Sequence, residues 1–420
     1  MATTIITTPS KPHKAEFLGA SGEKLAARLD LPAGPVRAFA LFAHCFTCSK
    51  DIFAAKRISA ELAQRGLAVL RFDFTGLGAS EGEFANTNFS SNVADLKSAA
   101  QWLADNHEAP AVLVGHSLGG AAVLTAAPDL PSVKAVVTIG APAEAEHITH
   151  LFADALDDIQ AHGETTATIG GRPFRVQRQL LEDLEGTKVL EAVKRIKAAL
   201  LVMHSPIDAT VGINNATDIF TAARHPKSFV SLDNADHLVS NHGDAAYAGE
   251  VIAAWASRFL PTMDDDTHHH EGEVVVAETG QGKFQNLVHA GPFHMFADEP
   301  ESVGGLNTGA PPYDYLSIGL GACTSMTLRM YADFKKLDLG RISVAVDHGK
   351  VHAEDCAGCA EDDLASGGKI DRFERRITVE GLNPETHPDL AAKIAEIADK
   401  CPVHRTLEKG AAVVTKVERA

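Results

Sequence analysis

A serine between glycines follows a run of small apolar residues and has the setting of a nucleophile. In the segment Ala111-Val-Leu-Val-Gly-His-Ser-Leu-Gly-Gly120, a strand would lead into G-x-S-x-G around Ser117 and then into helix-forming AAVLTAA. The strand-turn-helix order is more specific than the pentapeptide, which also occurs by chance. Glycines at 115 and 119 leave room for a sharp turn that exposes the hydroxyl. We predict that Ser117 is the nucleophile of a hydrolytic site.

A serine hydroxyl needs a base to take its proton and an acid to orient that base. Asp208 follows the apolar run AALLVMHS, and His237 follows SFVSLDNA, so each comes just after a predicted strand. The carboxyl ends of parallel strands meet at one edge of a sheet, where both residues could reach Ser117. Asp233 or Asp236 could orient the base instead, and His204 or His242 could be the base. Position in the chain favours Asp208 with His237.

Two cysteines late in the chain have the setting of a redox pair. Cys323 lies in PPYDYLSIGLGACTSMTLRMYADF, on the apolar face of a predicted helix that also carries Leu316, Leu320, Thr327 and Met330. Cys401 lies in DKCPVHRTL, where proline ends the preceding helix and is expected to start an extended run. A buried cysteine is most often only a small apolar residue. Two thiols at element junctions of one small domain can nevertheless meet.

The other four cysteines do not indicate a disulfide scaffold, because six cysteines are too few for a chain of 420 residues. Cys356 and Cys359 form C-x-x-C near His348 and His352, a set that could bind zinc. No second C-x-x-C lies near it, so a loop with free thiols is the favoured interpretation. We interpret Cys45 and Cys48 in the same way. No metal or cofactor is predicted.

Six short apolar runs before residue 260 predict strands that are buried on both faces. They are Ala38–Ala43, Leu67–Phe72, Ala111–Val114, Lys134–Ile139, Ala198–Met203 and Ser228–Leu232. The amphipathic segments between them predict helices, and hence an α/β doubly wound, mostly parallel sheet. The polar stretch PTMDDDTHHHEGE then indicates a linker. We place the first domain at 1–262, the linker at 263–272 and the second domain at 273–420.

The second domain has a different order of elements. Strands are predicted at 274–277, 284–290, 342–348, 370–380 and 411–417, and helices at 311–337 and 388–400. Strands clustered around two helices indicate an α+β domain.

Charge and hydropathy exclude several kinds of partner. The net charge of −17 disfavours nucleic acid and anionic membranes, and we find no segregated basic patch. No run of 18 apolar residues occurs, and the amino terminus lacks the pattern of a signal peptide. We expect a cytoplasmic protein that acts on small molecules.

Residues 15–260 resemble the α/β-hydrolase family. Beyond GHSLGG, the stretch AHCFTCSKD looks like the family's segment after the third strand, and RFDFTGLGASEG looks like its D-x-R-G-x-G-x-S loop. The resemblance implies hydrolysis of an acyl ester or thioester, with the backbone N–H groups of Phe46 and Leu118 as oxyanion hole. Cys45 stands where the family usually has glycine. A short cap is expected between residues 141 and 195.

Residues 275–417 resemble the OsmC/Ohr family of thiol-dependent hydroperoxide reductases. The matches are PYDYL, CTSMTLRMYA and ADKCPVHRTL. The resemblance implies an intertwined homodimer formed by this domain. It also implies that Cys323 attacks an organic hydroperoxide and that Cys401 resolves the sulfenic acid to a disulfide, which a dithiol reductant then reduces.

The chain differs from that family in the cation that stabilises the thiolate. Better-studied members use an arginine from the amino-terminal strands and a glutamate before the reactive cysteine, whereas no arginine occurs here between Arg258 and Arg329. Asp314 lies near the position of the glutamate, and the candidate cations are Lys283, His289, His294, Arg329 and Arg405. The alternative function for this domain is therefore a catalytically idle dimerisation or ligand-binding module.

Overall fold

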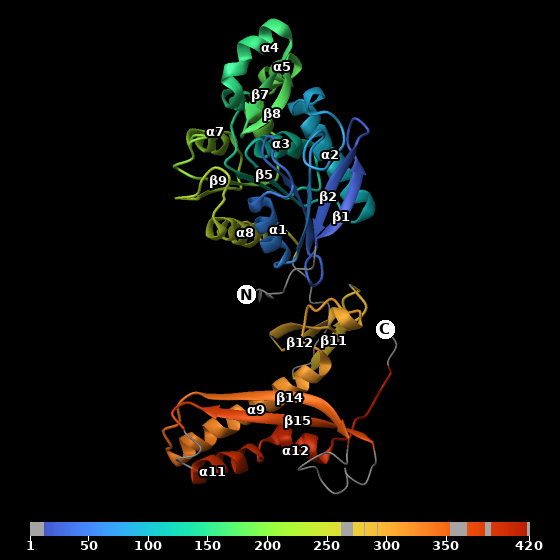
Figure 1. Cartoon of the computed structure of the whole chain (residues 1–420), viewed down its shortest axis with the longest axis vertical. Helices are drawn as coiled ribbons and strands as arrows, with labels where there is room; N and C mark the ends of the chain where they lie inside the picture. The colour runs from blue at the N-terminus through green and yellow to red at the C-terminus, as the bar shows by residue number, and fades with distance from the viewer. Residues whose placement is uncertain are drawn as a thin grey trace. The chain divides into compact units, whose positions relative to one another are not determined.

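The computed structural model describes residues 12–261, 272–280, 282–291, 293–352, 368–382 and 388–417. The chain forms two compact units, one of Met1–Phe296 with Gly304–Thr308 and one of Ala297–Val303 with Gly309–Ala420 (Figure 1). The predicted linker at 263–272 lies outside the described residues except for its last residue. The compact units thus divide later in the chain than the predicted boundary. Within the described ranges, no helix has the length and apolar character needed to cross a bilayer.

The first unit is built on an eight-stranded sheet of order β1-β2-β4-β3-β5-β6-β9-β10. Its strands are β1 (His13–Leu18), β2 (Lys24–Asp30), β3 (Ala38–Ala43), β4 (Leu67–Phe72), β5 (Val112–His116), β6 (Ala135–Ile139), β9 (Ala199–His204) and β10 (Lys227–Ser231). Neighbours from β4 to β10 are parallel, and β2 alone is reversed, since it pairs antiparallel with both β1 and β4. This sheet confirms the predicted doubly wound α/β fold.

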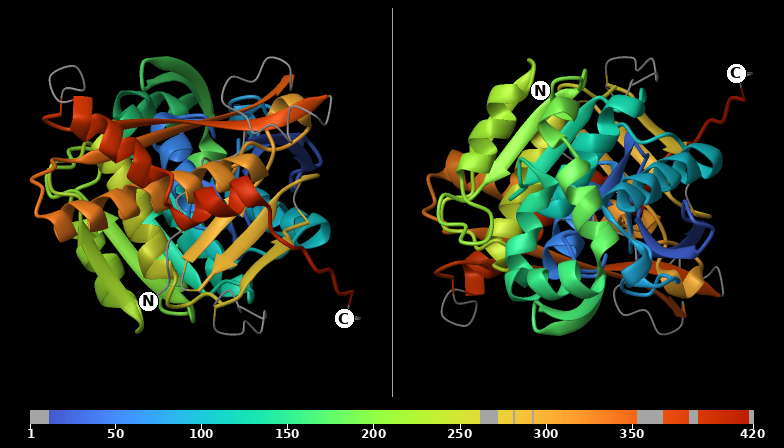
Figure 2. Two further views of the ribbon diagram at one scale, coloured as in Figure 1. Left: turned by 90° about the horizontal axis from the view of Figure 1, so that it is seen from below. Right: turned by 90° about the horizontal axis from the view of Figure 1, so that it is seen from above.

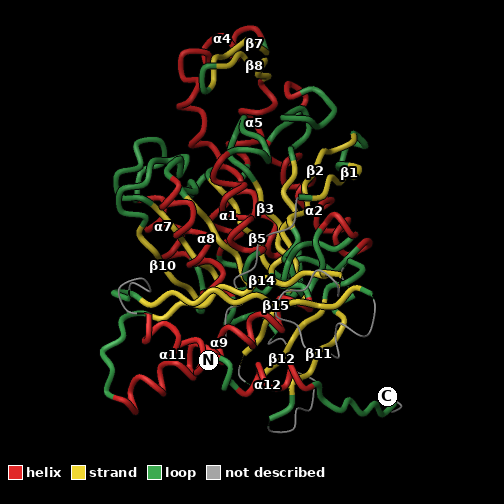
Figure 3. The backbone as a smooth tube through the Cα atoms, turned by 60° about the horizontal axis from the view of Figure 1, so that its bottom comes forward, coloured by secondary structure: helices red, strands yellow, loops and turns green. Residues whose placement is uncertain are grey.

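Helices cover both faces of this sheet (Figure 3). Helices α1 (Phe53–Ala63) and α8 (His242–Ala256) pack in one apolar cluster, and α2 (Phe89–Asn106) and α3 (Leu118–Ala126) pack in the other. Strands β3 and β4 are buried along their whole length, which is why their sequences are apolar apart from Arg71, whose charge pairs with Asp30. Helices α6 (Val189–Val193) and α7 (Asn214–Ala222) and the short 3₁₀ turns η1 (Phe84–Asn86) and η2 (Ala127–Asp129) complete the layers.

An insertion between β6 and β9 occupies the region where the sequence predicts a cap. It contains η3 (Ala145–Ala155), α4 (Leu156–His162), the antiparallel hairpin of β7 (Glu164–Ile169) and β8 (Arg172–Gln177), and α5 (Arg178–Gly186). In Figure 2 the insertion is green and lies toward the viewer in the right panel. Because this hairpin forms a two-stranded sheet of its own, it leaves the main sheet uninterrupted.

Strands β11 (Val274–Glu278), β12 (Asn286–Ala290) and β13 (Phe293–Ala297) form a separate three-stranded sheet. The second unit contains η4 (Glu301–Val303), α9 (Pro312–Lys335), the antiparallel pair β14 (Ile342–His352) and β15 (Lys369–Val379), α11 (Pro388–Ala398) and α12 (Pro402–Lys409). The described elements confirm an α+β arrangement. The predicted strand at 411–417 is wrong, because none of the described strands pairs with this segment to form a hydrogen-bonded ladder. Pro402 begins a helix rather than an extended run.

Candidate active site

Ser117 joins β5 to α3 in a backbone conformation that few residues adopt. Its φ of 53° and ψ of −124° are strained for a residue with a side chain. Its N–H donates to the Ile139 carbonyl at 2.8 Å, which ties the turn to β6. A Cβ on Gly115 would lie 2.3 Å from the Gly119 carbonyl oxygen, and a Cβ on Gly119 would lie 2.4 Å from the Ala43 carbonyl oxygen. Both glycines are therefore required by the close approach of β3, β5 and α3.

Ser117, His237 and Asp208 form a continuous hydrogen-bonded series. His237 Nε2 lies 2.9 Å from Ser117 Oγ, and His237 Nδ1 lies 2.8 Å from Asp208 Oδ2. The three residues follow β5, β9 and β10, whose carboxyl ends share one edge of the sheet. With Nδ1–H donated to Asp208, the lone pair of Nε2 faces the serine hydroxyl, as a general base requires. The structure thus brings the three predicted residues together.

Asp208 is held as an anion. The N–H groups of Thr210 and Val211 donate to its Oδ1 at 2.8 and 2.9 Å. Burial opposes ionisation, but the hydrogen bonds from His237 and Val211 outweigh it and hold the pKa of Asp208 below its usual value. The carboxylate can therefore stabilise an imidazolium on His237.

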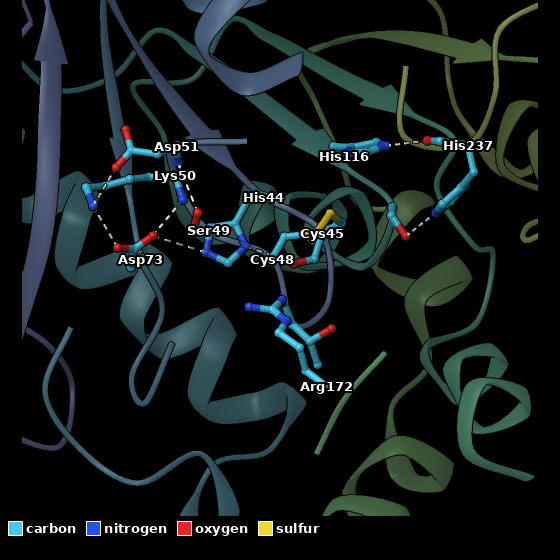
Figure 4. Close-up of a disulfide and its surroundings, with 12 residues drawn as sticks. His44, Cys45, Cys48, Ser49, Lys50, Asp51, Asp73, His116, Arg172 and His237 are labelled. Atoms are coloured by element: carbon cyan, nitrogen blue, oxygen red, sulfur yellow. Dashed lines mark hydrogen bonds and ion pairs between the residues drawn. A yellow bond between two sulfur atoms is a disulfide. The ribbon is translucent and has the colours of Figure 1, made fainter. Parts of the chain in front are cut away.

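A buried histidine, His116, holds the backbone of the base His237 in place. His116 Nε2 donates to the carbonyl of His237 at 2.7 Å (Figure 4). Burial lowers the pKa of His116 to about 4, so this ring is neutral near pH 7 and adds no charge beside His237. Nothing in the sequence pattern around Ser117 separates this role from that of an ordinary buried histidine.

The alternative acids and bases make other contacts. His204 donates to the Val211 carbonyl, Asp233 accepts from Ser231, Asp236 accepts from Ser240, and His242 begins α8 beside Phe53. His204 Nε2 still lies 3.8 Å from Asp208 Oδ2, and burial lowers the pKa of His204, so it is a neutral neighbour of the acid.

The predicted oxyanion donors lie at the ends of adjacent strands. Leu118 is the first residue of α3, and Phe46 lies in the loop after β3. Among the described residues, no protein group accepts a hydrogen bond from either N–H. A cavity of about 10 Å³ beside them is lined by apolar groups including Phe74, Leu77 and Phe89. Such a cavity holds about one water molecule, so it gives no room for a long acyl chain.

Hydrogen bonds and an ion pair on both sides of Phe46 hold its loop in place, and Figure 4 shows the residues that make them. Lys50 is buried, its Nζ lies 2.7 Å from Asp73 Oδ2, and its N–H donates to Asp73 Oδ1 at 2.5 Å. His44 contacts the Cys45 carbonyl at 2.8 Å, and Arg172 of β8 donates to the Thr47 carbonyl. The cap hairpin therefore touches the oxyanion loop directly.

Cys45 and Cys48 form a disulfide, so the interpretation of both as free thiols is wrong. Their Cα atoms lie 5.3 Å apart, within the range that the bond allows. The turn makes this proximity possible, because the Cys48 N–H bonds to the Cys45 carbonyl and Thr47 adopts a positive φ of 58°. A C-x-x-C spacing alone does not distinguish free from paired cysteines. The bond closes the loop around Phe46.

Cys323 of α9 and Cys401, the residue before α12, are free and hydrogen-bonded to each other. Burial and the contact with Cys401 raise the pKa of Cys323. Burial also disfavours charge on Cys401, but hydrogen bonds from Cys323 and from the His404 N–H outweigh it and lower the pKa of Cys401. The contacts around the pair therefore favour a negative charge on Cys401 over one on Cys323. The two predicted thiols do meet.

The residues predicted to support the thiolate lie elsewhere in this unit. Arg329 donates to the carbonyls of Leu339 and Gly340 beyond the end of α9, and Asp314 is exposed nine residues before Cys323. Arg405 is exposed, and its side chain has no polar partner within the described ranges. Within the described residues of one chain, none of the three contacts the thiols, and their support of the thiolate stays a prediction.

Arg375 of β15 approaches the thiol pair instead. Its Nη1 donates to Thr324 Oγ1 at 3.0 Å, and Thr324 in turn hydrogen-bonds to Cys401. Sequence reasoning missed this residue because it lies on a strand more than fifty residues after Cys323, with no local motif around it.

The interpretation of Cys356 and Cys359 as free thiols in a loop stays a prediction, because both lie outside the described residues. His348 bonds to Asp371 at 2.9 Å and stacks on Tyr313. In the part of the chain that the structure describes, no three His, Cys, Asp or Glu side chains are grouped to hold a metal ion.

Comparison with known proteins identifies both halves. Residues 40–278 match the Alpha/beta hydrolase family, and residues 305–416 match the OsmC-like proteins. The crystal structure of an esterase domain from a Rhodothermus marinus protein is 53% identical, covers 59% of this chain and 99% of that chain, and superposes with a TM-score of 0.51.

Two curated relatives match the first half at lower identity. The mitochondrial palmitoyl-protein thioesterase ABHD10 of Mus musculus is 26% identical over 187 residues, which cover 43% of this chain and 62% of that protein. The protein YfhR of Escherichia coli (strain K12) is 22% identical over 244 residues, which cover 56% of this chain and 78% of that protein. The chain belongs to the alpha/beta hydrolase family and carries an OsmC-like domain in its carboxyl-terminal part.

Proposed function

We propose that the first unit is a serine hydrolase that cleaves acyl esters or thioesters. The hydrogen-bonded series of Ser117, His237 and Asp208 carries this proposal. Ser117 Oγ attacks the acyl carbon while His237 takes its proton, and the N–H groups of Phe46 and Leu118 stabilise the oxyanion. His237 then protonates the leaving alcohol or thiol. Water repeats the sequence on the acyl-enzyme and releases the acid.

The likeness to an esterase domain at 53% identity supports the ester substrate, and the likeness to a palmitoyl-protein thioesterase supports the thioester. One mechanism serves both, because the two substrates share the acyl-enzyme intermediate. The direct test is turnover of p-nitrophenyl acetate and of a short acyl thioester by the purified protein, together with labelling of Ser117 by a fluorophosphonate. A protein that turns over neither substrate and takes no label would contradict the proposal.

Opening the Cys45–Cys48 disulfide is expected to slow this hydrolysis. In Cys48→Ser, kcat for p-nitrophenyl acetate should fall about three- to tenfold with KM little changed, because the Phe46 donor becomes less ordered and full loss of such a donor costs more. Wild-type protein whose Cys45–Cys48 disulfide has been reduced by a dithiol should show the same fall in kcat. Cys323→Ser serves as the control that leaves ester hydrolysis unchanged. Equal rates for oxidised protein, reduced protein and Cys48→Ser would show that the bond does not hold the donor in place.

For the OsmC-like domain we propose thiol-dependent reduction of organic hydroperoxides. The contact between Cys323 and Cys401 supports it, since a sulfenic acid on one thiol lies within reach of the other. The resulting disulfide would be reduced by a dithiol. The whole chain would then be bifunctional, and the alternative remains an idle dimerisation or ligand-binding domain.

We also propose that the chain forms a homodimer through this domain. Helix α9 carries an exposed apolar stripe at intervals of four or eight residues, with exposed fractions of 56% for Ile318, 66% for Met326, 72% for Met330 and 79% for Phe334. Large apolar side chains gathered in this way mark an interaction surface. A second copy of the chain is the occupant that the resemblance to intertwined dimers favours.

Placing a charge in this stripe is expected to give monomers. Light scattering should report a dimer for the full chain and a monomer for the double variant Met326→Glu and Met330→Glu, since two carboxylates cannot be buried there unpaired. Leu18→Glu, at an exposed apolar residue of β1, is the control that should stay dimeric. A shortened chain that ends near residue 262 should also be monomeric. If both the double variant and the shortened chain are still dimers, the proposed interface is wrong.

A further inference from the structure

Arg375 lies at the centre of the polar contacts around the thiol pair. Its side chain is 12% exposed, and its partners lie next to Cys323 or within three residues of Cys401 in the chain. They are Thr324 Oγ1 at 3.0 Å, the Ala398 carbonyl at 3.0 Å, Asp399 Oδ1 at 2.8 Å and His404 Nδ1 at 3.1 Å. One guanidinium thus joins α9, the end of α11 and the start of α12.

Two of these partners, Thr324 and His404, also contact the Cys401 sulfur. The Thr324 side chain and the N–H groups of Val403 and His404 hydrogen-bond to it, as does the thiol of Cys323. Cys401 also precedes α12, where helix N–H groups favour negative charge. These N–H, O–H and S–H contacts therefore stabilise an anion on Cys401, and the Thr324 hydroxyl lies between the Arg375 guanidinium and that sulfur.

We propose that Arg375 is the positioning cation of the thiol pair, holding Thr324 and His404 against the Cys401 sulfur. The proposal rests on the thiol chemistry proposed above, and it assigns the cation that the amino-terminal strands of this domain lack. Asp399 balances the charge of Arg375 on its exposed side at 2.8 Å.

The singly charged pair is suited to a two-step oxidation. The Cys323 proton passes across the shared hydrogen bond to Cys401, so that Cys323 attacks as a thiolate and its sulfur bonds to the terminal oxygen of an organic hydroperoxide as the O–O bond breaks. The alkoxide takes the proton back from Cys401 and leaves as the alcohol, which restores the Cys401 thiolate. The Cys401 thiolate then attacks the sulfenic sulfur, so that the S–S bond forms and hydroxide leaves. Two electrons pass from the thiols to the hydroperoxide. Because Cys401 is already charged, the second step needs no further base.

Only a few of the described titratable or charged side chains face Cys323 and Cys401, so few of these groups can change the charge around the two thiols. Within the described ranges they are Cys323 from α9, His404 from α12, Arg375 from β15 and Asp399 after α11, and Glu408 lies 3.7 Å from His404. Arg375 is the one cation among them that is charged at every working pH.

The test is the pH profile of thiol alkylation in the reduced full-length protein. Iodoacetamide modification of Cys323 and Cys401 is followed by peptide mass spectrometry from about pH 5 to about pH 9. In Arg375→Met we expect about tenfold slower modification of the pair near neutral pH and a profile displaced to higher pH, because the anion loses its cation. Arg375→Lys should restore most of the reactivity.

Arg376→Met is the matched control, since Arg376 is the next residue of β15, is 68% exposed and pairs with Asp347 instead. Its profile should equal that of the wild type. If Arg375→Met fails to fold, Arg375→Gln keeps hydrogen-bond donors without the charge and takes its place. A wild-type profile for the folded variant would overturn the proposal. Absence of hydroperoxide reduction by the wild type would refute the peroxidase function and leave this test intact.

Discussion

Ser117→Ala is expected to lower kcat for p-nitrophenyl acetate by about 10⁴-fold or more, because a triad serine acts as a unit with its base and acid. His237 and Asp208 would keep their mutual hydrogen bond but would have no hydroxyl to activate. Activity that remains would come from the oxyanion donors and from binding alone. Steady-state kinetics and loss of fluorophosphonate labelling measure the effect.

The control for this variant is Ser240→Ala. Ser240 lies in the same loop as His237 and bonds to Asp236, so it reports any disturbance of the loop without touching Ser117. Its kcat should stay within a few-fold of the wild type. Full esterase activity in Ser117→Ala would remove Ser117 from the mechanism. The assignment would also fail if Ser240→Ala lost activity to the same extent.

The central sheet could be predicted from sequence because its strands are buried on both faces. Six continuous apolar runs gave six parallel strands within one or two residues of their observed ends. Strands β1 and β2 were not predicted, since they lie at one edge of the sheet and mix charged with apolar residues. An alternating strand at an edge has a weaker pattern than a buried one.

Functional residues that lie in or directly after a local sequence pattern could also be predicted. Residues whose role depends on partners distant in the sequence could not. Ser117 is marked by its glycines, which the close backbone contacts require. Asp208 and His237 are marked by their place after strands. Arg375 and the Cys45–Cys48 disulfide depend on which segments meet in space, and neither leaves a pattern that separates it from its alternatives.

The predicted strand at 411–417 illustrates the same limit. Val413, Val414 and Val417 have high strand propensity, yet they are 89%, 83% and 94% exposed. A strand forms only where a neighbour supplies hydrogen bonds, and propensity does not report whether one is present.

Cys323→Ser is expected to abolish reduction of cumene hydroperoxide, measured with a dithiol as electron donor. The hydroxyl of serine cannot attack the O–O bond, because it is far less acidic and less nucleophilic than a thiol. The wild type should reduce cumene or fatty-acid hydroperoxides faster than hydrogen peroxide, since Leu316 and Leu320 of α9 give the surroundings of Cys323 an apolar character.

Cys401→Ser should stop the reaction at a later step than Cys323→Ser does. The first step remains possible, so one turnover leaves a sulfenic acid on Cys323 that dimedone traps, whereas catalytic turnover stops because no thiolate resolves it. Arg376→Met, on the exposed face of β15, is the control that should reduce the hydroperoxide at the wild-type rate. If fully reduced wild-type protein consumes no organic hydroperoxide, the thiol pair is not a peroxidase. The OsmC-like domain would then have to be assigned to dimerisation or ligand binding, and ester hydrolysis at Ser117 would be the single activity of the chain.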